Sequence, residues 1–166
     1  KETALGFSLS AAEDNLSIQI DWGDGTLTDK NINKANTYIQ GTPSGTKIIK
    51  IYADATTIKE LSLSYCSYLT EVDLSKCTAL KKLSVKECTK ITTFIHPEDA
   101  TTIESLTIDN SSIKNIDLHE WSGLKNLKYA PYGISTIVLP NEAEDLESLV
   151  LSKLSLKSID LNKYVN

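Results

Sequence analysis

Apolar residues return at a fixed spacing through the middle of this chain. An eleven-residue frame, L-x-x-L-x-L-x-x-C-x-x, occurs three times in succession from Ile58 and reads IKELSLSYCSY, LTEVDLSKCTA and LKKLSVKECTK. Self-similarity at a fixed period is typical of solenoids, in which each unit buries its apolar side against its neighbours. The pattern therefore predicts a solenoid over about two thirds of the chain.

Two of these units make one structural repeat. Their first apolar positions fall into two alternating series, Ile58, Leu80, Ile103, Leu124 and Leu146, and Leu69, Ile91, Ile113, Ile134 and Leu156. Members of one series lie 21 to 23 residues apart, so each repeat has about 22 residues and two halves, which we call the first and second columns. The L-x-L core of each half alternates between apolar and polar residues, as extended strands do. We expect a mainly β, right-handed solenoid of about five 22-residue turns over residues 55–166.

The first 54 residues do not follow the frame. The segment LSIQIDWGDGTLTD alternates apolar and polar residues up to Asp24-Gly25, a pair that is preferred in tight hairpin turns. The segments GFSLS, TYIQ and KIIKIYA predict further short strands. We expect a β-sandwich-like capping region over residues 1–54. Its last strand, with Ile48, Ile49 and Ile51, would cover the apolar end of the first turn.

The repeat length lies within the range of roughly 20 to 29 residues that leucine-rich repeats span. The segments LTEVDLSKCTALKKLSV, IKNIDL and LKSIDLNKY resemble the L-T-x-L-D-x-S-x-N-T-x-L pattern of bacterial surface leucine-rich repeat proteins, of the internalin type and of gut-commensal surface lipoproteins. The resemblance covers residues 58–162 and implies a leucine-rich repeat fold and a role at the cell surface. In the N-terminal region, the W-G-D-G core resembles that of the polycystic-kidney-disease (PKD) type β-sandwich.

Charge and composition exclude several classes of function. The net charge is −5, and no cluster of lysine or arginine offsets it, which argues against nucleic-acid binding. No apolar run reaches the roughly 18 residues of a membrane-spanning helix. The chain contains no methionine, so Lys1 is not a natural start; a removed secretion signal is one explanation and an arbitrary boundary is the other. With the family resemblance, we expect an extracellular or outer cell-surface location.

The cysteines and acidic residues point to structural roles. Three cysteines spaced eleven residues apart, without C-x-x-C, do not fit the common zinc patterns. They are interpreted as a ladder of small side chains at the corners of the turns, with a Cys66–Cys88 disulfide as the alternative. Asp21, Asp24 and Asp29 carry oxygens that suit calcium, but Asp24 is needed in its turn. We expect neither a metal nor a cofactor.

No arrangement of residues in the sequence suggests catalysis. His96 and His119 are the only histidines, and no G-x-S-x-G or S-x-x-K motif pairs a serine with a base. The sequence therefore predicts a protein that is not an enzyme.

A binding role is expected instead, because the strands of a solenoid present rows of outward side chains. In the first column these side chains are small and polar, with a few lysines. The candidate ligand contacts are Lys82, Lys86, Thr107, Asp109, Lys128 and Tyr132. Tyr129 takes an inward position, so Tyr132 and Tyr65 are the plausible aromatic contacts. The expected function is protein recognition or adhesion, with a host or envelope protein as partner. The alternatives are a structural spacer or cap that presents another domain, and a carbohydrate-binding module.

The last turn also bears on the expected partners. Its apolar side chains, among them Leu149, Leu151, Leu156, Ile159 and Leu161, have a stacked neighbour on one side only. Exposed apolar surface with free strand edges favours association, so we expect weak end-to-end self-association.

Overall fold

The fold is built almost entirely from strands. The computed structural model describes residues 4–45, 48–97, 99–133, 136–142 and 144–154, together with Tyr164. The strands are β1 (Leu5–Ala11), β2 (Leu16–Asp21), β3 (Leu27–Ile32), β4 (Thr37–Gly41), β5 (Lys50–Tyr52), β6 (Ile58–Ser64), β7 (Glu71–Asp73), β8 (Lys82–Lys86), β9 (Thr93–Ile95), β10 (Ser105–Asp109), β11 (Asn115–Asp117), β12 (Asn126–Ala130), β13 (Thr136–Val138) and β14 (Ser148–Leu151). One short 3-10 helix, η1 (Ala55–Thr57), precedes β6. The predicted mainly β solenoid is confirmed.

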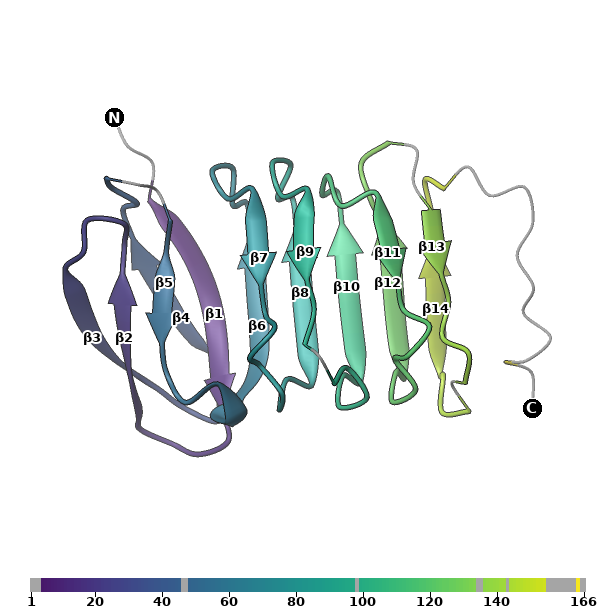
Figure 1. Ribbon diagram of the computed structural model, residues 1–166, viewed down its shortest axis with the longest axis horizontal. Coiled ribbons are helices and arrows are strands. Elements are labelled where there is room, and N and C mark those ends of the chain that lie inside the picture. Colours follow the sequence, from purple (N-terminus) through teal and green to yellow (C-terminus); the bar gives the residue numbers. More distant parts are fainter. Residues whose placement is uncertain are drawn as a thin grey trace.

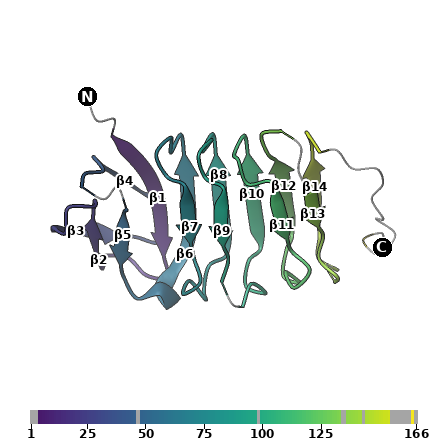
Figure 2. The same ribbon diagram turned by 45° about the horizontal axis from the view of Figure 1, so that its top comes forward.

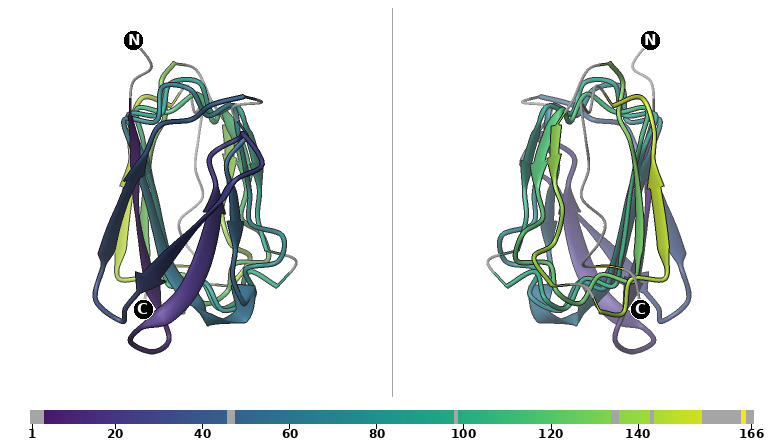
Figure 3. Two further views of the ribbon diagram at one scale, coloured as in Figure 1. Left: turned by 90° about the vertical axis from the view of Figure 1, so that its left-hand side faces the viewer. Right: turned by 90° about the vertical axis from the view of Figure 1, so that its right-hand side faces the viewer.

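The strands form two layers, which Figure 3 shows end-on. The first layer is one seven-stranded sheet in the order β14-β12-β10-β8-β6-β1-β4, and it contains every described first-column strand (Figure 1). The second layer consists of three separate sheets, β3-β2-β5, β7-β9 and β11-β13. The two columns read from the sequence thus correspond to the two layers of the solenoid.

The core runs between the layers along the long axis. The five first-column strands pair in parallel, so that Leu61, Leu83, Leu106, Leu127 and Leu149 stack in one inward row. Leu83, Leu106 and Leu127 are at most 1% exposed. Because burying one such side chain contributes about 1.5–3 kcal/mol, each turn is stabilised mainly by the turns on either side of it.

The described residues contain four complete turns and the first strand of a fifth, against the expected five. The second half of the fifth turn, with Leu156, Ile159 and Leu161, lies outside the described residues. Leu149 and Leu151 on β14 are only partly buried, whereas Leu127 and Tyr129, their neighbours on β12, are fully buried.

The N-terminal strands contribute to both layers. Strand β1 runs antiparallel to β6, with Phe7 opposite Leu63 and Leu9 opposite Leu61, and it extends the first layer. Strand β5, which was expected to cover the first turn, pairs with β2 instead. The reason is length and pattern, because β1 offers seven residues with alternating buried side chains to a seven-residue partner, whereas β5 offers three. The division into regions 1–54 and 55–166 stays a prediction.

The turn after β2 explains the acidic residues near Trp22. One carboxylate oxygen of Asp21 accepts the N–H groups of Gly23 and Gly25 at 2.8 and 2.9 Å, and these donors lower the pKa of Asp21. Asp24 accepts the N–H of Thr26 at 2.8 Å, which confirms its expected role in the turn.

The cysteines are free thiols at the corners of the turns. Cys66 and Cys88 are fully buried, and Cys77 is half-buried in the opposite layer. The Cys88 thiol donates to the carbonyl of Lys86 at 3.2 Å. The neighbouring Cys88 thiol, together with burial, raises the pKa of Cys66. The ladder of small side chains is therefore the arrangement that the structure has.

Candidate functional site

Outward side chains of the first layer form rows that cross the strands. In the middle row, Ser8 lies opposite Ser62, and the row continues through Ser84, Thr107 and Lys128. The first four of these side chains are small hydroxyls. They make a low floor of hydrogen-bonding groups across four strands, bordered by longer charged side chains.

The charged side chains on this face are partly paired with one another. The Lys82 ammonium lies 2.8 Å from the Glu60 carboxylate, which raises the pKa of Lys82. The Lys128 ammonium lies 2.5 Å from the Asp109 carboxylate. Such exposed pairs contribute little to stability, typically about 0–1 kcal/mol, but they hold the side chains in place. Among the described residues, Lys86 makes no ion pair, so it presents the uncompensated positive charge of this face.

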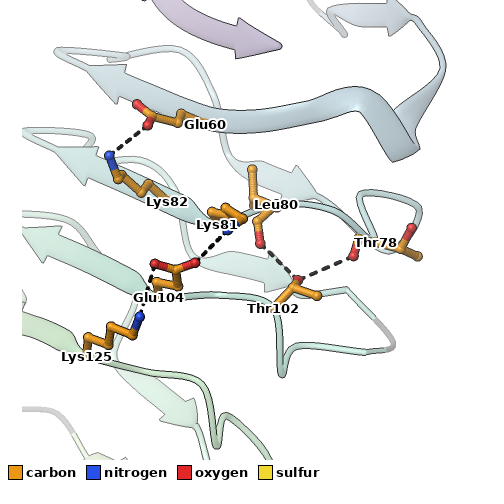
Figure 4. Close-up of polar contacts among 8 residues, drawn as sticks. All are labelled: Glu60, Thr78, Leu80, Lys81, Lys82, Thr102, Glu104 and Lys125. Atoms are coloured by element: carbon orange, nitrogen blue, oxygen red, sulfur yellow. Dashed lines mark hydrogen bonds and ion pairs between the residues drawn. The ribbon is translucent and has the colours of Figure 1, made fainter. Parts of the chain in front are cut away.

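A second group of polar contacts joins the turns just before the first-layer strands begin (Figure 4). Glu104 lies 2.7 Å from the ammonium of Lys81 and 3.6 Å from that of Lys125, and the Lys81 hydrogen bond lowers the pKa of Glu104. The Thr102 hydroxyl donates to the carbonyl of Leu80 at 3.0 Å. These groups connect three successive turns to one another, so their charges are already used within the solenoid.

A hollow of about 290 Å3 lies at the N-terminal end of the same face. It is lined by Ala4, Gly6, Phe7, Ser8, Tyr38, Ser62, Ser64 and Tyr65. The Tyr38 and Tyr65 side chains are 65% and 78% exposed, so two aromatic rings border a floor of small residues. A Cβ atom at Gly6 would lie 2.0 Å from the Tyr38 hydroxyl oxygen, so the absence of a side chain at Gly6 is what lets the Tyr38 ring lie over β1.

The backbone of Tyr65 adopts an unfavourable conformation. Its φ of 57° lies in the left-handed region, as do those of Glu87, Asn110 and Lys153 after the first-layer strands of other turns. The turn requires this geometry because each N–H reaches the next turn, as when Tyr65 donates to the carbonyl of Lys86 at 3.0 Å. A bulky aromatic residue tolerates the left-handed region less well than asparagine does. Strained residues of this kind cluster at functional sites.

The structure brings five of the six predicted ligand residues together. Lys82, Lys86, Thr107, Asp109 and Lys128 all lie on the outer face of β8, β10 and β12, within three neighbouring strands. Tyr132 lies beyond β12, where its N–H donates to Ser111 and its side chain is 66% exposed, apart from the hollow. Whether any of the six contacts a ligand stays a prediction.

The aromatic residues show what the sequence reasoning found and missed. Tyr129 is inward, as expected, and its buried hydroxyl donates to the carbonyl of Ile113 at 3.1 Å. Tyr65 was a candidate, but Tyr38 was not. The inward position of Ile39 indicates that Tyr38 points outward, yet nothing local shows that β4 joins the sheet that carries β6.

The histidines have structural surroundings. His119 lies 2.8 Å from the Asp117 carboxylate, a hydrogen bond that raises the pKa of His119, and its ring is exposed. The His96 ring packs edge-on against Trp121, with centroids 5.9 Å apart. Within the described residues, no group of three histidine, cysteine or acidic side chains is placed to hold a metal ion. No helix in the same part of the chain is long and apolar enough to cross a membrane.

Comparison with protein families agrees with this architecture. The model of the BspA type leucine-rich repeat region, in six copies, matches residues 28–132, which is more than half of the chain. The chain belongs to the BspA-type leucine-rich repeat family. The BspA-type match begins within β3, inside the region expected to form a separate cap. Neither a search of curated proteins nor a search of solved structures found a match.

Proposed function

We propose that this chain is a non-enzymatic protein-recognition or adhesion module, and that the outer face of the first layer is its recognition surface. The hollow between Tyr38 and Tyr65 is the observation that carries the proposal. Exposed aromatic side chains are enriched at protein interfaces, where they bury large areas at a low entropic cost. The family supports the same function, because leucine-rich repeat solenoids are scaffolds for binding.

The arrangement defines what a partner would present. Ser64, on the floor of the hollow, pairs with Lys86 on the neighbouring strand, so the unpaired ammonium lies beside the aromatic hollow. A partner that inserts an apolar side chain between the two rings and brings a carboxylate to Lys86 fits both features. The row of Ser62, Ser84 and Thr107 next to them offers hydroxyls to the partner's backbone.

A carbohydrate is the second candidate ligand. A floor of serine hydroxyls between two aromatic rings also suits a sugar, whose apolar face packs on a ring while its hydroxyls bond to the serines. The two candidates differ in the role of Lys86, because a neutral sugar gains nothing from the ammonium group.

We further propose a bacterial cell-surface or secreted location, on the family and on the resemblance to internalin-type and gut-commensal surface proteins. The PKD-like W-G-D-G core in the N-terminal region fits an extracellular protein in the same way.

Affinity capture with matched variants tests the proposed recognition surface. The wild-type chain, a Tyr38→Ser/Tyr65→Asn variant and a Tyr132→Ser control are each immobilised and exposed to host-cell surface and bacterial envelope extracts. Captured proteins are purified, and their affinities for all three chains are measured. The proposal expects at least tenfold weaker binding by the double variant and unchanged binding by the control, whose exposed tyrosine lies outside the hollow.

The other outcomes distinguish the alternatives. Binding on a glycan array that the double variant loses and Lys86→Glu retains would assign the hollow to a neutral sugar. Equal capture by the wild-type chain and the double variant would overturn the surface proposed here. A chain that binds neither proteins nor glycans would instead be a spacer or cap that presents another domain.

A further inference from the structure

The second layer of the solenoid is interrupted between β5 and β7. In the described part of the chain, β5 pairs only with β2 and β7 pairs only with β9, so each strand has one unpaired edge. In Figures 1 and 2, β5 and β7 lie on the same side of the molecule and stand further apart than β7 and β9. The first layer is continuous at the same place, because β1 pairs directly with β6.

Backbone hydrogen bonds show which groups face the interruption. On β7 and its flanks, Leu74 donates to the carbonyl of Ile95 at 2.8 Å, and the carbonyl of Thr70 accepts from Thr92 and Thr93. Alternate residues of a parallel strand bond to the same neighbour, so these even-numbered residues serve β9. The N–H and C=O groups of Glu71 and Asp73 therefore point toward β5.

An apolar cavity of about 230 Å3 lies beneath the interruption. Strands β1 and β6 line its back, Ile51 and Ala53 line one side, and Val72 and Leu74 line the other; all lining residues except Glu71 and Asp73 are apolar. The volume exceeds the roughly 150 Å3 that accommodates benzene, but is below the roughly 300–1,000 Å3 of a typical small-molecule pocket. It fits one or two apolar side chains.

The rim of the cavity has a preferred charge. The side chains of Glu71 and Asp73 are exposed along β7, and the N–H of Ser75 keeps the pKa of Asp73 below its usual value. Two carboxylates in one short strand favour an occupant with basic side chains at its outward positions.

The second layer is also unpaired between β9 and β11, but there side chains bridge the turns. The His96 ring, just after β9, packs against Trp121, which follows β11 and is 1% exposed. The combination of two unpaired edges with an apolar cavity is what distinguishes the interruption between β5 and β7.

We propose that this interruption is a docking site for an extended peptide segment of a partner protein. The segment adds a strand between β5 and β7, bonds to the free backbone groups of Glu71 and Asp73, and points alternate apolar side chains into the cavity. Its intervening side chains are basic and lie beside the two carboxylates. Strand addition of this kind takes its affinity from main-chain bonds and its selectivity from the alternate side chains. The site lies in the opposite layer from the Tyr38–Tyr65 hollow, so either proposal can fail without the other.

Three synthetic peptides test the mode of binding. The probe is acetyl-Lys-Val-Lys-Leu-Lys-Val-Lys-amide; one comparison peptide carries serine at the apolar positions, and the other is N-methylated at the same three positions. In an extended strand, the N–H groups of alternate residues point to the same edge, so these methyl groups block one whole edge. The proposal expects both comparison peptides to bind at least tenfold more weakly than the probe. It also expects the probe to shift amide resonances of residues 49–53 and 69–74.

Proline variants test the edge itself. Glu71→Pro removes one N–H from the free edge of β7 and is expected to weaken probe binding at least tenfold, since edge strands tolerate proline. Asn115→Pro is the matched control: Asn115 occupies the equivalent position on β11, where Lys114 and Leu118 bond to β13. Binding by this control is expected to be unchanged. Glu71→Lys keeps the N–H, reverses one charge and is expected to weaken binding at least threefold, which covers the case of a misfolded proline variant.

Two results would overturn the proposal. Equal binding of the probe and either comparison peptide would show that charge alone, or apolar contact alone, holds it. A concentration-dependent dimer that disappears in Glu71→Pro would show that a second copy of this chain fills the site instead.

Discussion

Replacing Tyr65 by asparagine is expected to stabilise the protein while weakening recognition. Tyr65 has a φ of 57° and a side chain that is 78% exposed, so it bears the cost of the left-handed conformation with little compensating burial. That conformation costs an ordinary residue on the order of 1–2 kcal/mol, and asparagine visits it more readily because its short side chain bonds locally. Asn110 already occupies the equivalent position two turns further along.

The expected gain is about 1 kcal/mol in the free energy of unfolding, because the loss of contacts by an exposed ring removes part of the relieved strain. For a chain of this length it corresponds to a rise of about 2–4 °C in Tm. Thermal and denaturant unfolding of the two chains measure it. Recognition through the hollow should fall in the same variant, as stability and function often oppose each other at strained sites.

Tyr132→Asn is the matched control for the strain argument. Its side chain is 66% exposed, but Tyr132 has no left-handed backbone, so the change in unfolding free energy should stay within about 0.5 kcal/mol. A Tyr65→Asn variant that is no more stable than wild type, or a control that gains as much, would refute the reasoning.

Three further predictions follow from the core, the thiols and the surface. Leu83→Ala should cost about 2–5 kcal/mol in chemical denaturation, whereas Ser84→Ala should cost under about 0.5 kcal/mol or stabilise, because the Ser84 hydroxyl is buried without a hydrogen-bond partner; equal losses would mean that the frame is wrong. Without reductant, all three cysteines should react slowly in the native protein and titrate as three thiols in denaturant; a single titratable thiol would reveal a disulfide. His119 should titrate above its usual pKa of 6.5 by NMR, and Asp117→Asn should lower that pKa. The stability from this pair is present below pH 6.5 and is lost as the pH rises through the higher folded pKa, so a His119 pKa below 6.5 would contradict the geometry.

The stack of turns could be predicted from the sequence because its contacts repeat locally. Each inward residue meets the residue about 22 positions away, so the spacing of Leu61, Leu83 and Leu106 already contains their register. The N-terminal arrangement could not be predicted in this way. The pairing of β1 with β6 joins segments about fifty residues apart, and it depended on which strand matched β6 in length.

The candidate site could be predicted only in part for the same reason. Lys82, Lys86, Thr107, Asp109 and Lys128 share a face because they follow the repeat. The hollow needs Tyr38 from outside the repeat, and the interruption beside β7 depends on a strand that failed to pair. Periodicity gives no information about either.

The unequal strands of the two layers set the unit in which such a protein can lengthen. Most first-layer strands of the turns have five residues or more, while every second-layer strand from β7 to β13 has three. Inserting eleven residues, the period most visible in the sequence, would place a three-residue strand between longer ones and leave their backbone groups unpaired. Inserting 22 residues adds one strand to each layer, extends the rod by about 4.8 Å and keeps every row in line. Genetic duplication and loss in this lineage are therefore expected to proceed by whole turns, which changes the reach of the arm while leaving the tyrosine hollow at its N-terminal end intact.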